Sequence, residues 1–140
     1  MRVISGTRRH ILLQTVNNLS IRPTTDKIKE TLFNIIQFQI QDTNVLDLFA
    51  GSGALGIECL SRGSLHATFV DNNKQAINCI NYNIEKTNFK EVSNVFHMSA
   101  LQFIKYKNNY CYDIVFLDPP YDKNLYIDIF ILWSSLGVFL

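Results

Sequence analysis

The sequence contains few of the residues that build disulfide-bonded, metal-binding or membrane-spanning proteins. Its three cysteines, Cys59, Cys79 and Cys111, are odd in number and widely spaced within apolar patterns, which predicts reduced thiols rather than a disulfide framework or a zinc site. The three histidines show no metal-ligand spacing. No apolar run is long enough for a membrane helix, and no signal segment is recognisable. These absences predict a cytoplasmic protein that uses neither a metal nor a membrane.

Net charge is also small, but it is unevenly distributed. The 140 residues carry a formal charge of +1, whereas residues 1–36 alone carry six Lys or Arg against two acids, a local charge of +4 that leaves −3 for the remainder. A basic amino-terminal arm on a near-neutral body predicts an anionic partner for the arm. A solvated surface with no partner is the alternative, and charge alone does not separate the two. The six basic residues of the segment 1–36 are Arg2, Arg8, Arg9, Arg22, Lys27 and Lys29.

The order of apolar segments predicts a single α/β domain that follows a short hairpin. Two apolar segments flank the basic turn Thr7-Arg8-Arg9-His10, which is typical of a hairpin. Short strands then alternate with helices, and this alternation predicts a parallel sheet with helices on both faces. We expect residues 1–22 to form the arm and residues 23–140 the domain. The predicted strands are 45–49, 66–70, 92–97 and 113–117, and the predicted helices are about 24–40, 54–61, 76–84, 100–106 and 125–134.

A glycine-rich turn after the first strand of the domain predicts a nucleotide-like cofactor. Residues 51–56 fit the pattern G-x-G-x-x-G between a strand and a helix, and Asp71 lies twenty residues beyond Gly51 at the end of the next strand. The first glycines allow a tight turn, the last allows helix and strand to pack, and the carboxylate can accept hydrogen bonds from ribose hydroxyls. The residues predicted to contact the cofactor are Asp47, Phe49, Gly51, Ser52, Gly53, Asp71, Asn72, Ser99 and Ala100.

Asp47 favours one cofactor over another. A carboxylate near the end of the first strand is unfavourable beside a pyrophosphate, but it suits the ammonium group of S-adenosylmethionine (SAM). Ser99 follows the third strand, where the adenine is expected, and its hydroxyl could accept a hydrogen bond from the adenine amino group. Asp47 therefore predicts SAM, with S-adenosyl-L-homocysteine as product. The alternative is that Asp47 and Asp71 only cap turns.

The catalytic residues are predicted at Asp118, Pro119, Pro120 and Tyr121, directly after the fourth strand. An exocyclic amine of a nucleobase is a poor nucleophile, so its N–H groups must be oriented. Asp118 and the Pro119 carbonyl can accept them, and Tyr121 can stack on an extruded base. Asp118, directly or through water, can take the proton released after transfer. A strand-ending turn with a buried tyrosine is the alternative. None of the cysteines lies in this loop, which disfavours a covalent thiol adduct.

Several segments together resemble one family, the bacterial 16S ribosomal RNA guanine-N2 methyltransferases of the RsmD type. The resemblance implies SAM as methyl donor and, as acceptor, a guanine N2 amine on an assembled or partly assembled small ribosomal subunit. It also implies an RNA-facing surface that includes Arg2, Arg8, Arg9 and Arg22. Ser99 departs from the acid or amide of many relatives. The segments that carry the resemblance are 1–6, 22–26, 30–34, 46–56, 60–63 and 118–121.

The end of the chain qualifies this expectation, because enzymes of this type continue beyond Leu140 with further strands. The expected fold is therefore a Rossmann-like SAM-dependent methyltransferase sheet that lacks its carboxyl-terminal strands. Residues 114–117 would then form a sheet edge through which the chain could self-associate. Three alternatives stay open: adenine-N6 methylation of nucleic acid, a non-catalytic RNA-binding relic, and, more remotely, a nicotinamide dehydrogenase.

Overall fold

The structure is a computed structural model that describes residues 1–16, 26–106, 111–119 and 127. Three of the predicted site residues, Arg22, Pro120 and Tyr121, lie outside the described residues, as does most of the helix expected at 125–134.

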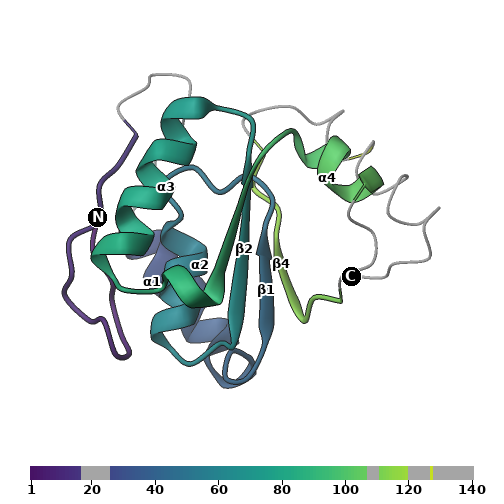
Figure 1. Ribbon diagram of the computed structural model, residues 1–140. Coiled ribbons are helices and arrows are strands. Elements are labelled where there is room, and N and C mark those ends of the chain that lie inside the picture. Colours follow the sequence, from purple (N-terminus) through teal and green to yellow (C-terminus); the bar gives the residue numbers. More distant parts are fainter. Residues whose placement is uncertain (17–25, 107–110, 120–126, 128–140) are drawn as a thin grey trace.

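Four parallel strands form the centre of the molecule (Figure 1). Neighbours pair in the order β3-β2-β1-β4, so that Asp47 lies opposite Phe69 of one neighbour and Phe116 of the other. Each observed strand falls within two residues of its predicted bounds, which confirms the parallel α/β sheet. The strands are β1 (Asn44–Asp47), β2 (His66–Asp71), β3 (Ser93–His97) and β4 (Ile114–Phe116).

Helices cover both faces of this sheet, as the alternation of segments predicted. Side chains of α1, α2 and α3 share one apolar cluster, and side chains of α4 belong to a second cluster with Leu46, Leu48 and Val70. The first helix ends earlier than predicted, because a 3-10 turn follows it and keeps Ile40 buried. The helical elements are α1 (Asp26–Ile36), η1 (Gln37–Gln39), α2 (Ala54–Ser61), α3 (Lys74–Lys86), η2 (Lys90–Val92) and α4 (Ala100–Tyr106).

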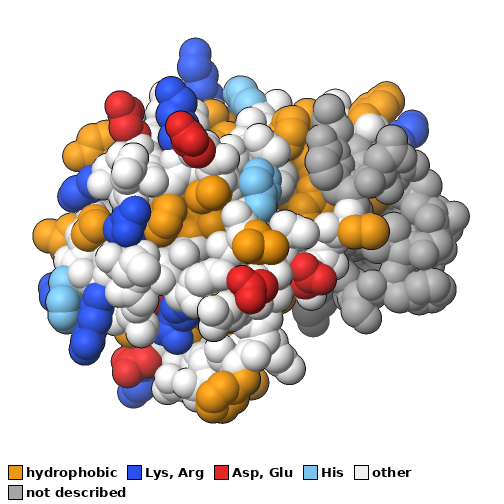
Figure 2. All heavy atoms as spheres, turned by 60° about the horizontal axis from the view of Figure 1, so that its bottom comes forward, with side chains coloured by type: hydrophobic (Ala, Val, Ile, Leu, Met, Phe, Trp, Pro, Cys, Tyr) orange, Lys and Arg blue, Asp and Glu red, His pale blue; other side chains and the backbone are white. Residues whose placement is uncertain are grey.

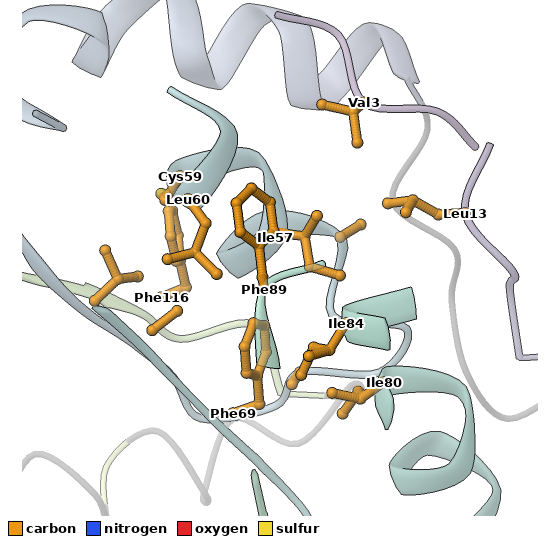
Figure 3. Close-up of a cluster of buried hydrophobic side chains, with 14 of the residues drawn as sticks. Val3, Leu13, Ile57, Cys59, Leu60, Phe69, Ile80, Ile84, Phe89 and Phe116 are labelled. Carbon is orange, nitrogen blue, oxygen red and sulfur yellow. The ribbon is translucent and has the colours of Figure 1, made fainter. Parts of the chain in front are cut away.

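The larger apolar cluster includes the amino-terminal segment. In Figure 3, Val3 and Leu13 of this segment lie on the same cluster as Ile57, Phe69 and Ile84, which come from α2, β2 and α3. Val3 is fully buried and Leu13 nearly so. Burying a large aliphatic side chain stabilises a fold by about 1.5–3 kcal/mol. The segment is therefore held against the helices by its own apolar side chains, although the boundary at residue 22 stays a prediction.

The predicted hairpin forms as a narrow antiparallel loop. Its two halves share one bridge, between Arg2 and Leu12, and the Val3 N–H donates to the Ile11 carbonyl at 2.9 Å. The chain then returns to the core through Leu13, whose N–H donates to the Met1 carbonyl at 2.8 Å. The basic turn of the arm thus lies at the end of a fixed loop.

A buried ionic network, which the sequence analysis did not predict, joins the hairpin to two helices. Glu58 of α2 is fully buried and forms ion pairs with Lys29 of α1 at 3.2 Å and with Arg62 at 2.8 Å. The same carboxylate accepts hydrogen bonds from the backbone N–H groups of Ile4 and Ser5, at 2.9 and 3.0 Å. Burial lowers the pKa of Lys29, and the Glu58 carboxylate opposes that change. A charge at position 58 therefore holds three segments together.

We predict that Glu58→Gln lowers the free energy of unfolding by about 3–5 kcal/mol, because it leaves the buried Lys29 ammonium without its counter-ion. Urea denaturation measures the change. Glu30→Gln is the matched control, since Glu30 is an exposed acid on α1, and its effect should stay within about 0.5 kcal/mol. Equal effects of the two substitutions would show that the network contributes nothing specific.

Candidate active site

The glycine-rich turn joins β1 to α2 at the carboxyl edge of the sheet. Gly51 and Gly53 both have positive φ angles, 57° and 80°, which side chains rarely allow. A Cβ added at Gly51 would meet no atom of the described residues within 4 Å, so the backbone there is open on that side. At Gly56 a Cβ would lie 2.3 Å from the Phe69 ring, which confirms that the last glycine lets α2 pack on β2. The turn is thus tight, open on its outer side and closely packed beneath.

Asp71 ties this turn to the end of β2. One carboxylate oxygen accepts the Gly51 N–H at 2.9 Å, and the other accepts the Asn73 N–H at 2.9 Å. Asp71 therefore caps this turn. A carboxylate has about four acceptor positions, so capping leaves capacity for a ligand. Asp71 can hold the turn and still accept hydrogen bonds from ribose hydroxyls.

Asp47 is the most unusual side chain of this edge. It is only 2% exposed, and its Oδ2 has no hydrogen-bond partner among the described residues. Burial raises the pKa of Asp47 to about 7, the negative charges of Asp71 and Asp118 add to that rise, and a hydrogen bond from the Gly56 backbone opposes it. A buried, unpartnered carboxylate oxygen is costly for the fold alone. The position is suited to a cationic ligand.

Asp118 completes a group of three carboxylates. It is exposed and lies two residues after β4, and Pro119 beside it is buried. Its charge acts on Asp47, so the ends of β2 and β4 bring Asp71 and Asp118 within electrostatic reach of Asp47 at the end of β1. Figure 2 turns the carboxyl edge toward the viewer and shows acidic side chains near the middle of this face. The structure thus brings together the predicted cofactor and catalytic acids.

Three further residues predicted to contact the cofactor, Asn72, Ser99 and Ala100, follow the ends of β2 and β3. Ser99 and Gln102 cap α4 reciprocally, because the Gln102 N–H donates to the Ser99 hydroxyl at 3.1 Å and the Ser99 N–H to the Gln102 side chain at 3.2 Å. The neighbouring Met98 N–H donates to the Asp71 carbonyl at 3.1 Å, which brings this segment to the end of β2. Asn72 is exposed and Ala100 is buried. The contact of Ser99 with adenine stays a prediction.

Sequence reasoning missed Asn83, a fully buried residue of α3. Its amide nitrogen donates to the carbonyls of Ser52 and Gln14, at 2.8 and 2.9 Å, and its amide oxygen accepts the Gln14 N–H at 2.7 Å. An asparagine between the apolar positions Ile80 and Ile84 was the available signal, because a buried amide requires several partners. Asn83 connects the glycine-rich turn to the segment that follows the hairpin.

The basic arm is divided between structural and exposed residues. Arg8 donates from Nε to the Thr87 carbonyl at 2.6 Å, and its guanidinium lies 4.7 Å from the centre of the Phe89 ring. Arg8 therefore stabilises the end of α3, whereas Arg2 and Arg9 are exposed. The assignment of these residues to RNA stays a prediction. Arg9 is more exposed than Arg8.

The described part of the chain contains no cluster of His, Cys, Asp and Glu side chains suited to a metal ion. Within the same residues, no helix has the length and apolarity needed to cross a membrane.

The sheet order, the glycine-rich turn after β1 and the acids that end β1 and β2 define a class: the Rossmann-like fold of SAM-dependent methyltransferases. The chain belongs to the family described as Conserved hypothetical protein 95, whose model matches residues 1–134. Relatives named ribosomal RNA small subunit methyltransferase D confirm the resemblance to the RsmD type.

Individual relatives cover nearly the whole chain. YlbH of Bacillus subtilis is 42% identical over 125 residues, which are 88% of this chain and 68% of YlbH. Ribosomal RNA small subunit methyltransferase D of Haemophilus influenzae is 40% identical over 127 residues, 89% of this chain and 66% of the relative. The solved structure of yhhF from Escherichia coli superposes with a TM-score of 0.86 at 34% identity and covers 100% of this chain and 75% of that one. The chain thus spans about two thirds of the length of these curated relatives.

We predict that Asp47 makes the stability of the ligand-free protein depend on pH. The folded state keeps the Asp47 proton up to about pH 7, whereas an unfolded aspartate loses it near pH 3.9. The folded state therefore binds more protons between these values, and stability falls as pH rises through that window.

Urea denaturation of wild type and Asp47→Asn from pH 5 to pH 8 isolates this effect, since the variant cannot titrate at position 47. The free energy of unfolding of wild type, relative to that of Asp47→Asn, should decrease as pH rises and become constant above about pH 7. Asn94→Gln, at an exposed amide, is the control and should give a pH-independent difference, because neither side chain titrates. A pH-independent difference for Asp47→Asn as well would mean that Asp47 is ionised throughout.

Proposed function

We propose that the chain is a SAM-dependent methyltransferase that transfers a methyl group to the exocyclic N2 amine of a guanine in 16S ribosomal RNA. The observation that carries the proposal is the buried Asp47 oxygen, which has no hydrogen-bond partner among the described residues and lies beside an open glycine-rich turn and within reach of Asp118. Support for the substrate comes from the relatives, one of which is the ribosomal RNA small subunit methyltransferase D of Haemophilus influenzae.

The residues present fit SAM. Asp47 offers an unpaired carboxylate oxygen for the ammonium group, Asp71 keeps acceptor capacity for the ribose hydroxyls, and the missing side chain of Gly51 leaves room at the turn. Bound SAM supplies an electrophilic methyl group on a sulfonium ion. Asn72, Ser99 and Ala100 would lie around its adenine, and the demethylated product would be S-adenosyl-L-homocysteine.

The acceptor base would be held by Asp118 and the Pro119 carbonyl. Asp118 is exposed, so an unstacked guanine can reach it, and its carboxylate can accept an amine N–H while the Pro119 carbonyl accepts another. This orientation would direct the nitrogen lone pair toward the methyl group. The proton released afterwards would leave through Asp118 or through water. Tyr121 is proposed to stack on the same base.

The RNA would be presented on an assembled or partly assembled small subunit in the cytoplasm, with Arg2, Arg9 and Arg22 toward its phosphates.

Among the described strands β4 is an outer one, and self-association of this chain is proposed to occur through β4. Sedimentation velocity should show a sedimentation coefficient that rises with protein concentration. A monodisperse monomer at all concentrations would contradict association through this edge.

Two substitutions separate cofactor binding from catalysis. Asp71→Ala should weaken SAM binding by about 1.5–3 kcal/mol, because it removes charge-assisted hydrogen bonds and the support of Gly51. Asp118→Ala should abolish methyl transfer and leave SAM affinity close to wild type, because it removes the acceptor for the amine. Calorimetry with SAM and with NAD measures binding.

Transfer of labelled methyl groups to small-subunit RNA from a strain that lacks this chain measures activity. Mass spectrometry of the digested RNA should find N2-methylguanosine, and N6-methyladenosine in its place would identify a different acceptor. Binding of NAD without SAM would exclude the methyltransferase proposal. Substantial turnover by Asp118→Ala would remove Asp118 from the catalytic role.

A further inference from the structure

A cavity lies on the outside of α3, separate from the group of carboxylates. It has a volume of about 500 Å³ and lies between residues 14–16 and α3. None of the described residues that line it is acidic or basic, and they include Gln14, Gln75, Asn78 and Tyr82. Such a lining offers amide donors and acceptors together with an aromatic ring. It suits a neutral, planar and polar group better than a phosphate or an aliphatic chain.

The same helix carries a cation at each end of the cavity. Lys74, Asn78, Tyr82 and Lys86 follow one another at intervals of four residues, so they form one stripe along α3, and all four are exposed. The stripe is about 18 Å long at the usual rise of an α-helix. Glu85 is the acidic residue of this helix sequence. Along α3 the Asn78 amide and the Tyr82 ring thus lie between Lys74 and Lys86.

The stripe is continuous with both the basic arm and the candidate active site. At its far end Thr87 accepts the Arg8 side chain, which places the basic turn of the hairpin next to Lys86. At its other end Lys74 follows Asn73, whose N–H donates to Asp71, and Asp71 also accepts the Gly51 N–H of the glycine-rich turn. In Figure 2 the Lys and Arg side chains of this face lie mostly on its left side, away from the described part of α4. A chain bound along the stripe would therefore extend from the arm toward the turn.

We propose that this stripe, Lys74, Asn78, Tyr82 and Lys86 with the adjoining cavity, binds a single-stranded segment of RNA. Tyr82, 52% exposed, would stack on an unpaired base, and the amides of the cavity would contact the edge of that base. Lys74 and Lys86 would contact phosphates on either side. The inference rests on the proposed function, because it supplies the nucleotides that flank the methylated guanine.

Fluorescence anisotropy with a labelled single-stranded RNA of about 12 nucleotides, a length typical of such sites, tests the proposal on the whole chain. Tyr82→Ala should raise the dissociation constant about tenfold, as expected for the loss of one stacked base. Tyr82→Phe should bind like wild type, because stacking needs the ring and not the hydroxyl. Tyr106→Ala is the matched control, since Tyr106 is 71% exposed on α4, and should have no effect.

The salt dependence of binding and the affinity for duplex RNA give two further readouts. Replacing both Lys74 and Lys86 with Ala should reduce the slope of log affinity against log salt by about 1.4 units, the value for two phosphate contacts on a single strand. A duplex of the same sequence should bind equally well to wild type and Tyr82→Ala. Equal affinity of wild type and Tyr82→Ala for the single strand, or an equal loss in Tyr106→Ala, would overturn the proposal.

Methyl transfer and SAM affinity, measured in parallel, keep the two proposals distinguishable. Tyr82→Ala should retain the SAM affinity of wild type and raise the KM for RNA with little change in kcat. If the chain methylates RNA but Tyr82 has no role in RNA binding, the RNA site on the stripe is wrong and the proposed function stands. A chain whose RNA affinity depends on Tyr82 but which does not bind SAM would overturn the proposed function and leave the stripe as a binding site.

Discussion

The buried carboxylate of Glu58 is the constraint on which the arrangement of the other elements depends. It forms ion pairs with Lys29 of α1 and with Arg62, the residue that follows α2, and it accepts two backbone N–H groups of the hairpin. A buried charge is tolerated only when its partners are present together. These segments are far apart in the sequence, so the pairing requires that α1, α2 and the hairpin occupy their final positions at the same time.

Asn83 has a similar effect at the functional edge. Its amide binds the carbonyl of Ser52 and both backbone groups of Gln14, so the glycine-rich turn and the segment after the hairpin share one buried side chain. A fully satisfied buried amide rigidifies its surroundings. The candidate cofactor site and the cavity beside α3 are therefore built on the same support, which gives a physical reason to consider them parts of one RNA-modifying surface.

At the carboxyl edge of the sheet, in contrast, buried and charged groups destabilise the fold. Burial and the negative charges of Asp71 and Asp118 raise the pKa of Asp47, and one oxygen of Asp47 has no hydrogen-bond partner among the described residues. These features oppose folding of the ligand-free protein. Residues that weaken a fold and lie where parallel strands end are typical of binding and catalytic sites. Glu58 differs from Asp47, because its buried carboxylate is paired with Lys29 and Arg62.

The sequence by itself determined the parallel α/β sheet, the helices at 54–61 and 100–106, and the acids at the strand ends, because apolar periodicity and glycine positions are local signals. Phe69 beneath Gly56 shows that even one tertiary contact followed from the motif. Only the tertiary structure decided the partners of Lys29, Glu58 and Asn83 and the commitment of Arg8 to the end of α3. Local pattern shows that a polar residue faces inward, but its partner is set by which distant segments pack against it.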